Sequence, residues 1–158
     1  MNRLAIAVLA ALLLPTVVRA GGPAEDATEL ARKITDEGAL NFERKDAVEL
    51  ANSYMDDAQL FLVSKDKDTG QIKVETSQGR SEIQSAYEDL LKGDKTVQAK
   101  NHVEYARLIA PDMLLISGTF ELGENGGNPL RLPFFQVRVK HGERWLVNSM
   151  RVFVVSND

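Results

Sequence analysis

The sequence predicts an α+β domain in which helices come first and pack on one face of an antiparallel sheet. Apolar residues in the first half recur mainly at helical spacing, whereas from Thr96 onward they recur at every second position. The clearest pattern lies at the end, where residues 130–140 and 144–155 alternate on either side of the turn His141-Gly142-Glu143. Successive side chains of a strand point to opposite faces, so these two arms predict a long terminal hairpin around which the sheet is organised.

The first twenty residues have the layout of a secretory signal peptide. Arg3 precedes an apolar run at 4–14, and Val18-Arg19-Ala20 offers a cleavage site after Ala20. This apolar run is too short for a stable transmembrane helix, which needs about 20 residues. We therefore expect residues 1–20 to be removed, with an N-terminal membrane anchor as the alternative, and residues 21–158 to form one secreted or periplasmic domain.

Charge and composition exclude several functions. Of the 158 residues, 44% are hydrophobic and 27% charged, which is typical of a folded soluble domain. Loss of the signal peptide moves the net charge from −4 to −6, with 17 basic against 23 acidic residues, so nucleic acid and anionic membranes are not expected partners. The chain has no cysteine, and it lacks a phosphate-binding glycine loop and the common hydrolase motifs, so no cofactor is expected.

Acidic N-cap residues predict a helical hairpin at the start of the domain. Asp26 is followed three residues later by Glu29, a capping box that starts a helix running to about Glu43. Asp46 caps a second helix, whose apolar stripe we expect to include Tyr54.

A third helix is predicted to start at the capping box Ser81-Glu-Ile-Gln84. Its buried stripe includes Ile83 and Tyr87, and Gly93 is the natural stop.

Four further stretches predict the remaining strands. Residues 58–63 form the first strand and 72–76 an edge strand, while 97–110 and 113–122 pair across Pro111-Asp112. The loop at 66–70 superficially resembles a calcium loop, but its fifth position is glycine and its twelfth is serine. We expect a turn there and no metal site.

Four stretches, in this order and spacing, resemble the nuclear-transport-factor-2-like (NTF2-like) superfamily. They are the stretch 46–60, which contains Asp-Asp-Ala at 56–58, the Gly-Arg-Ser-Glu-Ile at 79–83, and the hairpin stretches 108–118 and 142–147. The likeness is closest to the SnoaL-like and SgcJ/EcaC branches and spans 26–155. It implies a cone-shaped fold, with three N-terminal helices packed on a curved antiparallel sheet around an apolar pocket. This scaffold carries isomerases, dehydratases, cyclases and binding modules, so the resemblance implies no particular activity.

Steroid isomerases of this superfamily use a tyrosine, an aspartate base and a protonated acid. Aligned on the shared Asp-Asp-Ala and Pro-x-x-x-x-Arg patterns, these positions fall near Gly38, Leu62 and Phe135. None of the three side chains can exchange a proton. The resemblance therefore does not extend to isomerase catalysis of that type.

Dehydratase-like relatives need a histidine and an acid that face the pocket. The chain has two histidines, and His141 falls in the predicted hairpin turn. His102 and Glu104 lie two residues apart, hence on one face of a strand, and are the weak catalytic candidates, as a general base or one edge of a metal site. The simpler interpretation is a polar pair that faces solvent.

The expected function is binding of a small, mainly apolar molecule without established catalysis. Arg151 is expected to orient the ligand through an anionic group, or else to pair with Glu104 or Glu121 within the sheet. An aromatic lining is also what a plain core contains. The expected ligand-binding residues are Tyr54, Phe61, Tyr105, Phe135, Trp145 and Arg151.

The opposite, convex face of the sheet is expected to form a homodimer, by analogy with relatives. An SgcJ/EcaC- or SnoaL-type enzyme acting on a small organic substrate and a non-catalytic dimerisation module are the alternative functions. The expected interface residues are Phe134, Gln136, Asn148 and Met150.

Overall fold

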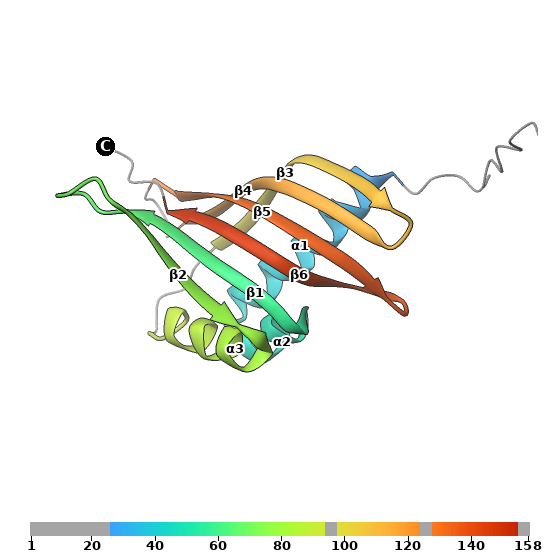
Figure 1. Ribbon diagram of the computed structural model, residues 1–158, viewed down its shortest axis with the longest axis horizontal. Helices are drawn as coiled ribbons and strands as arrows, with labels where there is room; N and C mark the ends of the chain where they lie inside the picture. Colours follow the sequence, from blue (N-terminus) through green and yellow to red (C-terminus); the bar gives the residue numbers. More distant parts are fainter. Residues whose placement is uncertain (1–25, 94–97, 124–127, 155–158) are drawn as a thin grey trace, which may run out of the picture.

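The computed structural model describes residues 26–93, 98–123 and 128–154 (Figure 1). The predicted signal peptide lies outside these residues. Among the helices that are described, none has the length and apolar character needed to cross a membrane. The described ranges form one layer of helices against one six-stranded, unclosed sheet, which confirms the α+β class.

The first two helices confirm the predicted hairpin. Helix α1 (Ala27–Glu43) is capped by Asp26, whose carboxylate accepts a hydrogen bond from the Thr28 amide at 2.9 Å. Helix α2 (Ala47–Asn52) is capped in the same way by Asp46. Each cap satisfies an amide that the first helical turn leaves without a partner.

Helix α3 (Gly79–Leu90) begins two residues before the predicted capping box, at Gly79, whose φ of 81° suits glycine. Tyr54 was also expected in a helix, and that prediction is wrong. Helix α2 stops at Asn52, because the Ser53 carbonyl accepts a hydrogen bond from the Val147 amide and the chain joins the sheet.

The strand order is β2-β1-β6-β5-β4-β3. All neighbours are antiparallel except β1 and β6, which pair in parallel, so the expectation of a purely antiparallel sheet is wrong at this one pair. A parallel pair needs a long connection, and here residues 66–143 separate its two members. The strands are β1 Tyr54–Lys65, β2 Ile72–Gln78, β3 Gln98–Ala110, β4 Met113–Gly123, β5 Leu130–His141 and β6 Arg144–Val154.

The helices cover only one face of the sheet, here named the inner face. Helix α1 packs against β3, while α2 and α3 pack together near β1 (Figure 1). One core cluster lies under α1 and the other under α3. The clusters contain Leu30, Ala31, Leu114, Ile116 and Phe134, and Tyr54, Ala58, Ile83 and Val147.

The predicted orientation is reversed over the part of the hairpin away from its turn, whereas Trp145 near the turn lies on the inner face as expected. Phe134 and Gln136, expected on the convex face, are 3% exposed, and Met150 packs against both core clusters. Phe135 and its cross-strand neighbour Arg151 are exposed on the opposite face instead. Both arms carry apolar residues on both faces, so alternation located the strands but not the side that the helices cover.

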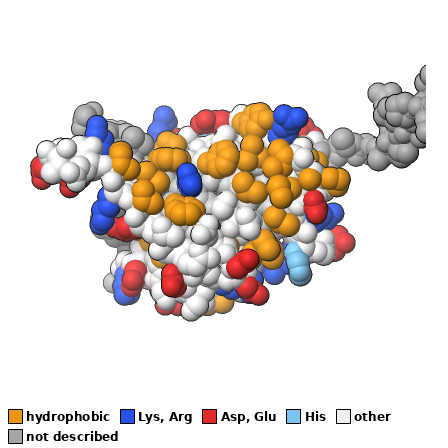
Figure 2. Space-filling view, in the orientation of Figure 1, with side chains coloured by type: hydrophobic (Ala, Val, Ile, Leu, Met, Phe, Trp, Pro, Cys, Tyr) orange, Lys and Arg blue, Asp and Glu red, His pale blue; other side chains and the backbone are white. Residues whose placement is uncertain are grey.

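The uncovered outer face is rich in apolar side chains. Figure 2 views the molecule from this side and shows hydrophobic groups spread over much of the sheet. Phe135 is 41% exposed, Phe153 37% and Val74 53%. Contiguous apolar surface of this kind is typical of interaction sites.

Candidate functional site

A pocket of about 460 Å³ lies between α1, α2 and the turn end of the β5–β6 hairpin. We call it the arginine pocket, after the buried Arg138 in its wall. Its apolar walls come from both helices and from β6. The apolar lining residues are Leu30, Ile34, Leu50, Trp145 and Leu146.

Arg138 is 6% exposed and is oriented by two hydrogen bonds. Its Nε donates to Gln136 Oε1 at 2.6 Å, and its Nη1 donates to the Trp145 carbonyl at 3.0 Å. Both acceptors are neutral. Among the described residues no carboxylate lies within ion-pair distance of the guanidinium, and Nη2 has no hydrogen-bond partner.

This environment disfavours the charged guanidinium. Burial lowers the pKa of Arg138 to about 10, against the weaker opposing influence of Tyr54, Tyr87 and Glu37. Arg138 remains charged at neutral pH at that value. A buried charge is ordinarily paired, so the pocket wall presents a cation that lacks an adjacent anion.

Two tyrosines connect the neighbourhood of Arg138 to the core. The hydroxyls of Tyr54 and Tyr87 lie 2.8 Å apart, and that of Tyr54 also contacts the Met150 sulfur at 3.2 Å. Burial raises the pKa of both tyrosines, so both hydroxyls stay neutral near pH 7. These two tyrosines therefore supply neutral hydroxyls near Arg138, and neither is a phenolate that could balance its charge.

The mouth of the pocket carries charges of both signs, all of them exposed. Three bases and three acids of the lining lie there, so Arg138 is the buried charge of the wall and the others are solvated. They are Lys33, Lys140 and Arg144, and Glu37, Glu49 and Glu143.

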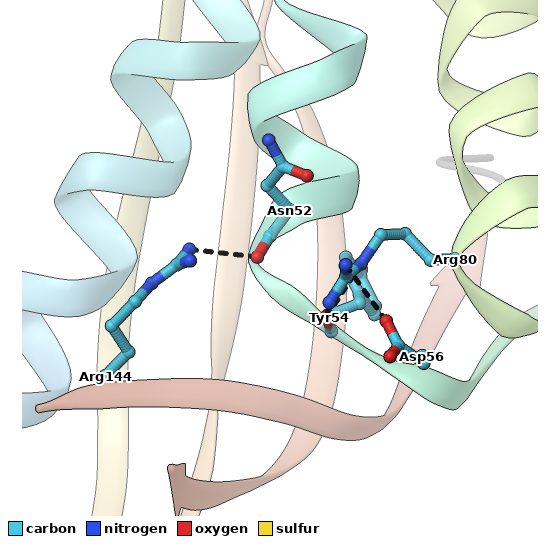
Figure 3. A network of polar contacts seen from close by, with 5 residues as sticks. All are labelled: Asn52, Tyr54, Asp56, Arg80 and Arg144. Atoms are coloured by element: carbon cyan, nitrogen blue, oxygen red, sulfur yellow. Dashed lines mark hydrogen bonds and ion pairs between the residues drawn. The ribbon is translucent and has the colours of Figure 1, made fainter. Parts of the chain in front are cut away.

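Two arginines fix the junction between α2 and β1 at the edge of the pocket (Figure 3). Arg144 reaches from the start of β6 to the Asn52 carbonyl at 2.9 Å. Arg80 donates to the Tyr54 carbonyl at 2.8 Å and pairs with Asp56. These contacts hold the pocket-lining end of α2 against the sheet.

Solved structures share the fold of this chain. An NTF-2 like protein of unknown function from Shewanella oneidensis MR-1 has a TM-score of 0.62 at 16% identity, over 80% of this chain and 98% of that one. A ketosteroid isomerase-like protein from Erwinia carotovora atroseptica has a TM-score of 0.61 at 14% identity, over 84% and 98%. A cystatin-like domain of unknown function from Nostoc punctiforme PCC 73102 has 0.61 at 16% identity, over 84% and 80%. The fold is NTF2-like.

No family model matches the chain, and no curated protein matches it by sequence. The likeness thus lies in the backbone, as expected when identity is this low. Because one NTF2-like scaffold carries many activities, the function must be argued from the site itself.

The NTF2-like fold places the predicted ligand residues in different regions. Trp145 lines the arginine pocket, and Tyr54 lies buried beside Arg138. Arg151 stacks over the Phe61 ring at 4.9 Å and forms no ion pair with a described residue, so the expected partners Glu104 and Glu121 are wrong. The two other expected residues, Tyr105 and Phe135, are 47% and 41% exposed and do not line the pocket.

The proposed His102/Glu104 pair does not form. His102 bonds Glu121 at 2.8 Å, and Glu121 also pairs with Arg131. Glu104 instead accepts a hydrogen bond from Thr119. None of these side chains lines the arginine pocket, so the geometry offers no support for this catalytic pair.

The 66–70 loop forms a turn, as predicted. The Asp66 carboxylate accepts hydrogen bonds from the amides of Asp68 and Thr69 and from the Thr69 hydroxyl. The bond from the Thr69 amide contributes most to lowering the pKa of Asp66. The carboxylate oxygen is thus used within the turn itself.

Sequence reasoning missed Arg138 as a site residue, because it looks like an ordinary polar position on an alternating strand. The available signal was its spacing from Gln136. Two polar residues at i and i+2 share a strand face, and that face also holds Leu132 and Phe134. A polar pair that continues an apolar stripe can indicate a buried polar site.

Proposed function

We propose that this NTF2-like domain is exported and binds a small organic molecule in the arginine pocket. The observation that carries the proposal is the buried, orienting cation in the wall of a pocket of about 460 Å³. Small-ligand sites typically occupy about 300–1,000 Å³ and combine apolar walls with a few placed polar groups. The arginine pocket combines both features, with Arg138 in the orienting role first given to Arg151.

Gly38 offers a direct test, because it lines the pocket from α1 and an added Cβ would meet no atom within 4 Å. Gly38→Leu would place a side chain in the pocket without a backbone clash. We expect ligand-observed NMR with a fragment library to find binders of the natural protein that Gly38→Leu loses. The matched control is Asp36→Leu, at an exposed position of α1 outside the pocket. The proposal fails if no fragment binds the natural protein, or if both variants behave alike.

A second proposal is a homodimer formed through the outer face of the sheet. Its support is the exposed apolar surface in Figure 2, which lies opposite α1. The relevant side chains differ from those first expected, because Phe134, Gln136 and Met150 lie on the inner face and Asn148 contacts Met55 beside a register shift. Outer-face side chains with large exposure are Val74, Tyr105, Ile109, Phe135 and Phe153.

Light scattering after size exclusion tests this dimer. Phe135→Glu would place a charge within the proposed apolar interface, and we expect it to convert a dimer to a monomer. Val48→Glu, on α2 and 51% exposed, is the control that should leave the mass unchanged. A natural protein that is monomeric at 100 µM (on the order of the concentrations that populate weak interfaces) would contradict the proposal.

A further inference from the structure

We infer that the ligand of the arginine pocket is a small organic monocarboxylate, whose carboxylate binds Arg138 on the side of the free Nη2; this ligand class rests on the proposed function. The way in which the guanidinium is held, its surroundings and the other charges of the pocket point to this class of ligand.

The groups that hold Arg138 in place are neutral. An amide oxygen of Gln136 and a main-chain carbonyl of Trp145 orient the guanidinium without neutralising it. A purely structural buried arginine is usually matched by a carboxylate, since an uncompensated buried charge is strongly unfavourable. In the part of the chain that the structure describes, no such carboxylate is within 4.0 Å of Arg138. The missing anion is therefore assigned to the ligand.

The two hydrogen bonds of Arg138 leave several guanidinium protons free for a ligand. Nε and one Nη1 proton are used, which leaves both protons of Nη2 and one of Nη1. A planar guanidinium with neighbouring free protons matches the two oxygens of a carboxylate. Because the two acceptors fix its orientation, the guanidinium presents paired N–H donors in a defined direction, which a flexible lysine ammonium would not do.

The other residues of the pocket lining favour an organic monoanion. Apolar side chains, including Ile34, Leu50 and Trp145, offer surface for an organic body. The three acids at the mouth are matched in number by three bases, so Arg138 leaves the lining with a net charge of +1, which matches a monoanion better than a doubly charged phosphate. Together these features favour an amphiphilic acid with one carboxylate over inorganic phosphate or a phosphate ester.

Isothermal titration calorimetry with matched acids and amides tests the inference. The probes are a panel of acid and amide pairs with phenyl, indolyl and short alkyl bodies, for example 3-phenylpropionate and 3-phenylpropanamide, and inorganic phosphate. We expect the best acid to bind the natural protein at least tenfold more tightly than its amide. Arg138→Met should abolish this preference, and Arg138→Lys, which keeps the charge but loses the fork, should weaken acid binding at least fivefold. Each variant is first checked for a cooperative thermal transition, and either of them suffices for the test.

Two further variants test whether acid binding depends on Arg138 itself or on the overall charge of the protein. Arg107→Met removes an exposed cation from β3, outside the pocket, and should leave acid affinity within twofold. Glu37→Gln removes the carboxylate that acts on Arg138 from a distance, and should strengthen acid binding by roughly two- to fivefold. An equal loss in Arg107→Met and Arg138→Met would overturn the inference.

The other outcomes distinguish the inference from the proposed function. If acids and amides bind equally, and Gly38→Leu removes both, the pocket binds ligands but the carboxylate inference is wrong. Tighter binding of phosphate than of any acid would also overturn it. If no member of the panel binds, both the inference and the proposed function fail.

Discussion

Replacement of Arg138 by methionine should barely change the stability of the ligand-free protein, although Arg138 is buried and hydrogen-bonded. Removing one member of a buried ion pair typically costs about 3–5 kcal/mol, because the other charge is left unpaired. Arg138 has no paired charge among the described residues, so that penalty should be absent.

The magnitude follows from two opposing contributions. The fall of the Arg138 pKa from its ordinary value to about 10 corresponds to a net penalty on the charged form of about 3.5 kcal/mol, at about 1.4 kcal/mol per pKa unit. Methionine has no charge and avoids this penalty. The loss of two hydrogen bonds from a charged donor costs about 3–6 kcal/mol in total. Contact of the methionine with apolar walls offsets part of the remainder, so we expect a net change of no more than about 1–2 kcal/mol.

Urea denaturation at pH 7, followed by circular dichroism, measures this change. Phe134→Ala, on the same strand and 3% exposed, is the reference for an ordinary core position and should lose about 3–5 kcal/mol. A loss of 3 kcal/mol or more in Arg138→Met (about the size expected for a broken buried ion pair) would show that the folded protein supplies a counter-ion. The reasoning that assigns this anion to a ligand would then be refuted.

Three further predictions concern other positions. Gly38→Ala should raise the free energy of unfolding by about 0.5–1 kcal/mol in chemical denaturation, because Gly38 lies inside α1 and an added Cβ has open space; a destabilised variant would contradict this. Gly118→Ala should destabilise by about 2 kcal/mol or more, because its Cβ would lie 2.1 Å from the His102 carbonyl oxygen on β3; a melting temperature equal to that of the natural protein would show that the strands yield easily. Glu121→Gln should reduce the loss of stability in acid, since the hydrogen bond from His102 lowers the pKa of Glu121. The stabilisation by ionised Glu121 is complete above the ordinary carboxyl pKa and disappears as the pH falls through the lowered value. Identical acid unfolding curves for Glu121→Gln and the natural protein would therefore contradict a contribution of the His102–Glu121 hydrogen bond to stability.

Most secondary-structure elements could be predicted because their signals are local. Asp26 and Asp46 cap helices that start one residue later, since a carboxylate at the N-cap satisfies amides within the same turn. The terminal hairpin was predicted to within one residue at its ends, because alternation and the turn at Gly142 act over short distances. The start of α3 was misplaced because its N-cap residue, Gln78, makes no side-chain capping bond.

The orientation of the strands could not be obtained in this way. Phe134 and Phe135 are adjacent and chemically identical, yet one is buried under α1 and the other is exposed. Gln136 and Arg138 look like solvent-facing residues, and only the helical layer that covers them makes them buried. Phe61 and Phe135 were placed on the wrong face for the same reason, whereas Trp145 lines the arginine pocket.

The sequence by itself determined the elements, the α+β class and the resemblance to an NTF2-like fold, because capping, turn formation and periodicity depend on neighbouring residues. The tertiary structure decided which face of the sheet is covered, the parallel pairing of β1 with β6, and the assembly of the arginine pocket. These features depend on contacts between residues distant in the chain, such as the bond from Arg144 to Asn52. The role of Arg138 is visible only in the tertiary structure, because burial without a counter-ion among the described residues depends on its surroundings and not on its place in the sequence.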